Sequence, residues 1–173
     1  MILQRIILGF LAIGPMSGYD LKRHFDSTAN NFWSADKAQI YRTLAALVAD
    51  GLVAVRKVPG AAGPDRQEHR ITAAGRATLH EWLVSELDRQ PERDAFLARV
   101  FFAGELDAAE VAELLGRRRD AARALLTNLE TIRDEAPEPA TRAERVRLAT
   151  LDNGLRHTRT ELAWLDDVEK ELT

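Results

Sequence analysis

The sequence predicts a mainly α-helical protein with one small β-hairpin, arranged as an N-terminal winged helix-turn-helix and a C-terminal α-helical domain. Two observations predict this fold class. Residues 17–72 contain two helix-like segments followed by two strand-like runs around a Gly-rich turn, the order expected of a helix-turn-helix with a β-wing. From residue 94 onwards, apolar residues recur at helical spacing. Because Pro91 interrupts the chain between these parts, we expect two domains, residues 1–90 and residues 91–173.

The first predicted helix spans residues 2–13, whose apolar side chains fall on one face. Arg5 interrupts the apolar run, the run is too short to cross a bilayer, and no small-residue cleavage site follows it. A helix of the protein core is therefore favoured over a signal peptide. Gly14 and Pro15 are expected to end it, because proline cannot continue the hydrogen-bond ladder.

Capping patterns indicate where the next two helices begin. Ser17 and Asp20 have the spacing of a capping box, which predicts the start of the second helix. Ser34 is the expected N-cap of a third helix over residues 35–50, and Gly51 is its expected stop.

The predicted hairpin and fourth helix complete the first domain. Residues 52–58 and 66–71 are expected to form the two strands, with a turn at residues 59–64 that contains two glycines. Thr72 is expected to cap a fourth helix that continues to about residue 87.

The C-terminal half predicts three helices. A short one covers residues 94–103, and capping boxes at Asp107 with Glu110 and at Thr141 with Glu144 begin two longer ones. In the last helix, leucines recur at alternating spacings of three and four, which is a heptad seam. This seam predicts a homodimer contact, with packing against the preceding helix as an alternative that could coexist with it. The expected dimerisation residues are Leu148, Leu151, Leu155, Leu162 and Leu165.

Several classes of chemistry have no support in the sequence. The chain has no cysteine, hence no disulfide or thiolate metal site, which suits a cytoplasmic protein. Its four histidines lack metal-ligand spacing, and Ser17 falls one position late for a nucleophile elbow. The glycines near residue 60 precede a strand and lack the Gly-Lys-Ser/Thr of a phosphate-binding loop. We therefore expect no enzyme, no cofactor and no metal.

Charge is distributed unevenly along the chain. Residues 1–71 contain nine lysines and arginines and six acidic residues, a net charge of +3, whereas the whole chain has −3. This mild basic bias coincides with the predicted winged helix and supports a nucleic-acid partner for it.

The third predicted helix has one apolar face and one face suited to reading DNA. Ile40, Leu44 and Leu47 lie on the first face, whereas Gln39 and Arg42 lie on the second among small alanines. Gln can pair with adenine in the major groove, and Arg with guanine or with phosphate. The alternative is an ordinary solvated face, since Ala, Gln and Arg are good helix formers.

Further cations and hydroxyls point to phosphate contacts. Lys37 lies in the first turn of the third helix, where the helix dipole disfavours a cation unless an anion such as a DNA phosphate approaches, although Asp36 could also balance the charge. Lys57 and Arg66 flank the turn of the wing, which could also be a plain hairpin. The candidate DNA-binding residues are Ser17, Tyr19, Lys22, Ser34, Lys37, Gln39, Tyr41, Arg42, Lys57 and Arg66.

The first half of the chain resembles the PadR-like transcriptional regulators, in their longer form with a helical C-terminal domain. The matching motifs are residues 14–21 (GPMSGYDL), residues 39–44 (QIYRTL), residues 63–66 (GPDR) and residues 70–75 (RITAAG). The resemblance implies that the third helix is the recognition helix, that Tyr41 and the turn at residues 17–19 approach phosphates, and that the wing carries Arg66. It also implies a homodimer on a palindromic site. The family often has proline where this chain has Arg42, so the role of Arg42 is inferred from its position alone.

The combined expectation is a DNA-binding regulator that acts as a repressor, whose residues 1–90 bind DNA and whose residues 91–173 dimerise and sense an effector. Trp82, Phe101 and Trp164 are candidates to line an apolar effector pocket for a small aromatic or hydrophobic molecule, and plain core packing is the alternative. A winged-helix module that binds protein instead of DNA is the competing functional hypothesis.

Overall fold

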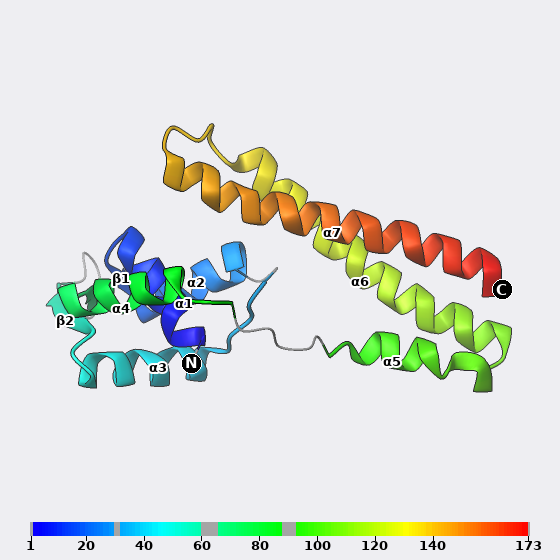
Figure 1. The fold of residues 1–173 in the computed structure, drawn as a ribbon, viewed down its shortest axis with the longest axis horizontal. Helices are drawn as coiled ribbons and strands as arrows, with labels where there is room; N and C mark the ends of the chain where they lie inside the picture. Colours follow the sequence, from blue (N-terminus) through cyan, green and yellow to red (C-terminus); the bar gives the residue numbers. More distant parts are fainter. Residues whose placement is uncertain (1, 30–31, 60–65, 88–92, 173) are drawn as a thin grey trace. The chain divides into compact units, whose positions relative to one another are not determined.

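The computed structural model describes residues 2–29, 32–59, 66–87 and 93–172. The chain divides into two compact units, Met1–Arg89 and Gln90–Thr173, and each is described by itself. The structure is mainly helical with a small antiparallel sheet, which confirms the predicted fold class (Figure 1).

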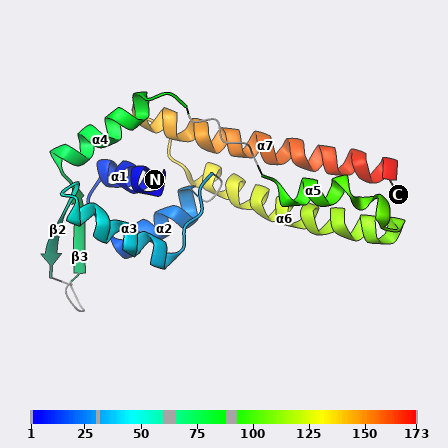
Figure 2. The ribbon, with the colours of Figure 1, turned by 60° about the horizontal axis from the view of Figure 1, so that its bottom comes forward.

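The first unit contains four α-helices and three short strands among its described residues. In chain order these are α1 (Ile2–Ile13), β1 (Met16–Ser17), α2 (Gly18–His24) with a π-helical turn (Phe25–Ala29), α3 (Lys37–Ala49), β2 (Val53–Val58), β3 (Arg66–Ile71) and α4 (Ala73–Val84). The strands pair antiparallel in the order β1-β3-β2, and the β2–β3 hairpin projects from the helices as the wing (Figure 2). The strand β1 was not predicted, because two residues are too few to show an alternating pattern.

The core of the first unit is built around α1. Its buried face packs with α2, α3 and the sheet, as the periodicity of residues 2–13 predicts. The most deeply buried side chains are Ile7, Leu8, Leu11, Leu21, Phe25, Ile40, Leu44 and Leu47. This packing fixes α2 and α3 against each other and leaves the opposite face of α3 in solvent.

The start of α3 differs from the prediction. Its N-cap is Asp36, not Ser34: the Asp36 carboxylate accepts the backbone N–H of Gln39 at 2.7 Å, and the Gln39 side-chain oxygen accepts the N–H of Asp36 at 3.1 Å. A carboxylate near a helix N-terminus also complements the helix dipole, which explains why Asp36 is used in place of the serine. Residue 35, the predicted first residue of this helix, therefore lies before it, and the Ala35 side chain is buried.

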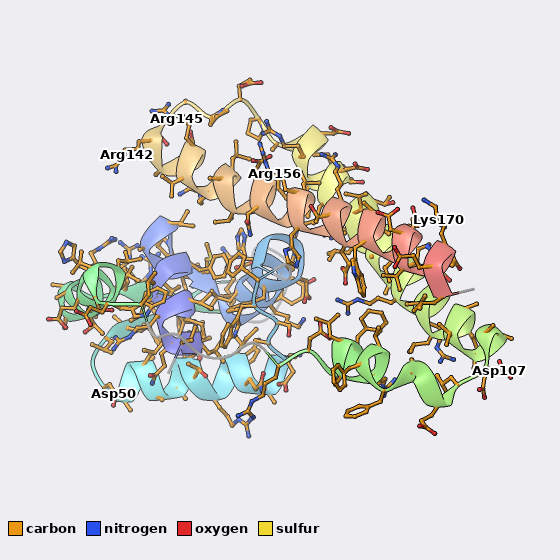
Figure 3. The ribbon with its side chains drawn as sticks, turned by 45° about the vertical axis from the view of Figure 1, so that its right-hand side comes forward. Asp50, Asp107, Arg142, Arg145, Arg156 and Lys170 are labelled. Atoms are coloured by element: carbon orange, nitrogen blue, oxygen red, sulfur yellow. The ribbon has the colours of Figure 1, made fainter. Side chains whose placement is uncertain are left out.

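The second unit is a helical hairpin with a short helix beside it. Its elements are α5 (Ala95–Phe101), a 3₁₀ turn (Ala103–Glu105), α6 (Ala108–Glu135) and α7 (Arg142–Leu172). Both predicted capping boxes are present, at Asp107 with Glu110 and at Thr141 with Glu144. Figure 3 shows Asp107 and Arg142 at the starts of the two long helices.

The leucine seam of α7 is occupied by α6 of the same chain. Leu151 and Leu155 are buried with Leu129, and Leu165 is buried with Leu115. Arg119 of α6 crosses the same interface, where its guanidinium binds the carboxylates of Asp166 at 3.1 Å and Glu169 at 2.6 Å. The seam thus packs within the chain at Leu151, Leu155 and Leu165, as the alternative stated above allows, whereas Leu148 and Leu162 are partly exposed. The role of these five leucines in a dimer stays a prediction.

No helix within the described ranges is both long enough and apolar enough to cross a membrane.

Candidate nucleic-acid interface

The helix α3 presents a polar face to solvent. Thr43, Leu44 and Leu47 are buried on its inner side, whereas Lys37, Tyr41 and Arg42 are exposed on the other. The exposed alanines of this helix, Ala38, Ala45, Ala46 and Ala49, allow close approach of another surface. The result is a helix with long donors among short side chains, which has the dimensions and chemistry to enter a major groove.

Tyr41 connects α3 to the beginning of α2. Its ring lies against the backbone of Gly18, and a Cβ atom built on Gly18 would be 2.7 Å from Tyr41 Cζ and 3.0 Å from its hydroxyl oxygen. The Lys37 Nζ lies 5.9 Å from the centroid of the same ring, within cation–π range. Because Tyr41 is still 44% exposed, its hydroxyl group remains accessible beside the first turn of α2.

Unpaired cations surround this tyrosine. In the described part of the first unit, the cations in ion pairs are Lys22, Arg56 and Arg70. Lys37 and Arg42 therefore form no ion pair in this part of the chain. Such cations on an exposed helix can contact phosphates, and Arg42 can also reach a base edge.

Ser17 and Lys22 have partners within the protein. The Ser17 hydroxyl donates to the Asp20 carboxylate at 2.7 Å and accepts the N–H of Asp20 at 3.1 Å, and this bond from Ser17 is the main reason why the pKa of Asp20 lies below its ordinary value. Lys22 pairs with Asp26. Ser17 therefore holds the start of α2 in place, whereas Tyr19, which is 65% exposed, is the freer of the two residues.

Gln39 and Ser34 also differ from their predicted roles. The side-chain oxygen of Gln39 is used by the capping box, so that its NH₂ group is the part left for an external contact. Ser34 is exposed ahead of α3 and caps no helix. Both residues can still belong to the interface, but their availability depends on where α3 begins.

The two cations of the wing lie on opposite faces of the hairpin. Lys57 pairs in register with Gln67, and Val58 with Arg66, and adjacent positions of a strand point to opposite sides. The charge of Arg66 also helps to lower the pKa of Asp20, after the dominant effect of Ser17. The predicted turn spans residues 59–64, of which residues 60–64 lie outside the described part of the chain.

The candidate effector residues are divided between the two units. Trp82 belongs to the first unit, whereas Phe101 and Trp164 belong to the second. Trp164 packs edge to face with Phe96 at 6.2 Å between ring centroids, and Phe101 packs with Phe102 and is 82% exposed. No group of acidic or histidine side chains in the described residues could hold a metal ion.

Two features of the interface were missed by sequence reasoning. Gly18 was not identified, although a glycine directly after an N-cap serine could have suggested a close approach. Asp36 was considered only as a charge beside Lys37, yet its spacing to Gln39 is that of a capping box.

Comparisons with known proteins agree with this geometry. Residues 7–81 match the Transcriptional regulator PadR-like family, and residues 92–173 match the family called Virulence activator alpha C-term. The negative transcriptional regulator PadR of Bacillus subtilis is 30% identical over 131 residues, which cover 75% of this chain and 71% of that protein.

Solved structures share the whole fold. The Bacillus subtilis PadR structure in complex with operator DNA has a TM-score of 0.89 at 24% identity, covering 100% of both chains. The complex of that protein with p-coumaric acid has a TM-score of 0.80 at 24% identity and covers 99% of both chains. The structure of the Vibrio cholerae virulence activator AphA has a TM-score of 0.78 at 28% identity, covering 98% of this chain and 97% of that one. The fold, the match to the family over residues 7–81 and the identity to the Bacillus regulator together show that this chain belongs to the PadR-like family of transcriptional regulators.

Proposed function

We propose that the protein is a sequence-specific DNA-binding repressor that acts as a homodimer on a palindromic operator. The observation that carries this proposal is the exposed face of α3, on which Lys37, Tyr41 and Arg42 lie together while the opposite face is buried. In this assignment α3 enters the major groove, Tyr41 and Lys37 contact phosphate, and Arg42 reads a base edge or a second phosphate. A protein that binds chromosomal DNA would act in the cytoplasm.

The proposed DNA contacts follow from which donors remain available. Tyr19, Lys37, Tyr41 and Arg42 are exposed at or beside α3, and Arg66 extends the surface toward the wing. Ser17, Lys22 and Gln39 act mainly by holding the starts of α2 and α3 in position. Lys57, on the other face of the hairpin, would reach DNA only if the wing lies edge-on along a groove.

A homodimer follows from the proposed operator symmetry. Two copies of α3 would occupy successive major grooves about 34 Å apart. Because Leu151, Leu155 and Leu165 are buried within the chain, we place the dimer contact on exposed apolar side chains of α5 and of the residue that follows it, namely Leu97, Phe101 and Phe102. An apolar group of this kind on a soluble domain typically marks an interface.

The repressor role and a small-molecule effector are supported by the relatives. The Bacillus relative is named as a negative regulator, and its structure was solved with operator DNA and with p-coumaric acid. By analogy, we propose that this protein represses transcription and is released from DNA when a small organic molecule binds.

A binding titration tests the central proposal. Fluorescence anisotropy with DNA from upstream of the protein's own gene should show binding that weakens steeply as salt rises from about 50 mM to about 200 mM. Arg42→Ala and Lys37→Ala should each weaken binding by about 1–3 kcal/mol. Arg76→Ala, which removes an exposed arginine of α4, is the matched control and should bind as the unaltered protein does.

The competing hypothesis is a winged-helix module that binds another protein. It would be favoured if no salt-sensitive binding occurs with the upstream DNA or with any fragment of a genomic library. Equal affinity of the Lys37, Arg42 and Arg76 variants would instead retain DNA binding and reject the assigned face of α3.

A further inference from the structure

A recess in the second unit brings three arginines together, far in sequence from the proposed DNA contacts. Its volume is about 670 Å³, and it is lined by Arg93, Asp94, Ala95, Phe96, Arg99 and Arg118. This volume falls within the range of small-molecule sites, about 300–1,000 Å³. We propose that the recess binds a small organic anion, whose carboxylate or phosphate group is held by the arginines while its apolar part lies against Phe96.

The Arg118 side chain is held in one position at this site by contacts within the protein. Its Nε donates to Glu161 of α7 at 2.6 Å, its Nη2 lies 3.9 Å from Asp94, and its Cζ lies 5.1 Å from the centroid of the Phe96 ring. These contacts hold the guanidinium in place before any ligand arrives, which reduces the entropy lost on binding. Its Nη1 group has no hydrogen-bond partner among the described residues, so it can still donate to an anion.

The charges at the recess are not balanced. The Asp94 carboxylate caps α5 by accepting the N–H groups of Leu97 at 3.1 Å and Phe96 at 2.7 Å, and the bond from Leu97 is the leading cause of its lowered pKa. Glu161 is engaged by Arg118. Within the described ranges, no carboxylate pairs with Arg93 or Arg99. Among the described residues that line the recess or pair with its lining, three guanidinium groups therefore meet two carboxylates, and this excess of positive charge favours an anion.

Phe96 supplies the apolar part of the site. Its ring packs edge to face against Trp164 of α7, with 6.2 Å between the ring centroids, and this contact holds the ring in place at the side of the recess. A wall of this kind favours an anion with an apolar group over inorganic phosphate. Arginine forks match carboxylate and phosphate equally well, so the two classes of ligand must be separated by experiment.

This inference goes beyond the proposed function, and only the description of the ligand as an effector would rest on it. Binding of an anion in the recess can be measured without DNA. A failure there would leave the assigned DNA interface unaffected, and a failure of DNA binding would leave the recess unaffected.

Isothermal titration calorimetry with four probes tests the site: benzoate, phenyl phosphate, inorganic phosphate and uncharged benzamide. We expect benzoate or phenyl phosphate to bind the full-length protein, and binding to weaken at least about tenfold in the double variant R93A/R99A, which corresponds to about 1.4 kcal/mol. The control is R123A/R145A, which removes two exposed arginines and the same charge. Figure 3 shows Arg145 near the start of α7, at the end of the hairpin away from Asp107.

Four results would overturn the proposal. These are the absence of binding by both organic anions, equal weakening in the two double variants, benzamide binding as tightly as benzoate, and inorganic phosphate binding as tightly as phenyl phosphate. Far-UV circular dichroism should show that R93A/R99A is folded, because both arginines are exposed and no ion pair involves them within the described residues. The same variant should bind upstream DNA normally in the absence of anion, and a loss of DNA affinity would mean that these arginines contact DNA instead.

Discussion

The Tyr41 ring of α3 lies directly on the backbone of Gly18 in the first turn of α2. A Cβ atom at position 18 would come within 2.7 Å of Tyr41 Cζ and 2.8 Å of its Cε1. The absence of a side chain at Gly18 thus determines where the tyrosine hydroxyl stands. The relationship links the two helices of the proposed interface through one side chain that is held on one side and exposed on the other.

Gly18→Ala should weaken DNA binding while leaving the protein folded. The new methyl group must displace Tyr41, and this is feasible because the atoms it meets are the far end of a partly exposed side chain. We expect roughly a tenfold loss of DNA affinity, about 1.4 kcal/mol, by anisotropy. Gly9→Ala is the control: nothing lies within 4 Å of its Cβ, and alanine within a helix should stabilise the protein by about 0.5–1 kcal/mol. Unchanged DNA affinity in the Gly18 variant would show that the position of the Tyr41 side chain does not contribute to DNA binding.

Gly75→Ala should mainly lower the stability of the protein, because its new methyl group would meet a backbone atom and not the end of a side chain. A Cβ atom on Gly75 would be 2.2 Å from the carbonyl oxygen of Leu52, and that oxygen already accepts the N–H of Thr72 at 3.0 Å. Relief requires α4 to move away from the turn before β2, which we expect to cost about 3 kcal/mol of unfolding free energy. Urea denaturation followed by far-UV circular dichroism measures this loss, and a change below that of Gly18→Ala would contradict it.

His69 should make the stability of the first unit depend on pH. It is 6% exposed in β3, its Nδ1 lacks a hydrogen-bond partner in the described structure, and burial lowers its pKa from the ordinary 6.5, opposed by a weaker effect of the Met16 backbone. The unfolded chain then binds more protons than the folded chain. The contribution of neutral His69 to the free energy of unfolding is fully present above pH 6.5 and is lost as the pH decreases through the lower pKa of the folded state.

The test compares two histidine variants. In urea denaturation between about pH 8 and about pH 5, His69→Leu should show a smaller decrease of unfolding free energy than the unaltered protein. His80→Leu, which replaces an exposed histidine of α4, should keep the full decrease. The same pH profile in all three proteins would exclude His69 as its source.

Leu155→Glu should unfold the second unit and not merely separate two subunits. Leu155 is buried with Leu129 and Leu151 between α6 and α7, so a glutamate there leaves a charge inside a single chain. We expect a loss of at least about 3 kcal/mol. Val146→Glu, at an exposed position of the same helix, should change stability by no more than about 0.5 kcal/mol. A stable, folded monomer from Leu155→Glu would restore the seam as the dimer contact.

Phe101→Glu with Phe102→Glu should instead give a folded monomer. Both rings are largely exposed in the single chain, so the substitutions bury no charge unless a second chain covers them. Size-exclusion chromatography with light scattering reports the mass, and far-UV circular dichroism reports the helix content. A dimer that persists at micromolar concentration would move the interface to another surface.

Most of the elements follow from local rules. The capping boxes at Ser17, Asp107 and Thr141, the helical periods and the Gly14-Pro15 break are short-range patterns, and helices in the predicted places confirm them. The start of α3 was misplaced because Ser34 and Asp36 are both good caps, and the reciprocal capping box with Gln39 forms at Asp36. The two-residue β1 has no detectable pattern of its own and exists because β3 offers it a pairing edge.

The sequence by itself determined a winged helix-turn-helix, an exposed polar face on its third helix and a leucine row on its last, since these depend on spacing along the chain. Only the tertiary structure decided which groups on those surfaces remain available. It placed the Tyr41 ring on Gly18 and used the leucine row to join α7 to α6. The physical reason is that burial and hydrogen bonding are settled between segments far apart in the chain, whereas periodicity states only which side chains share a face.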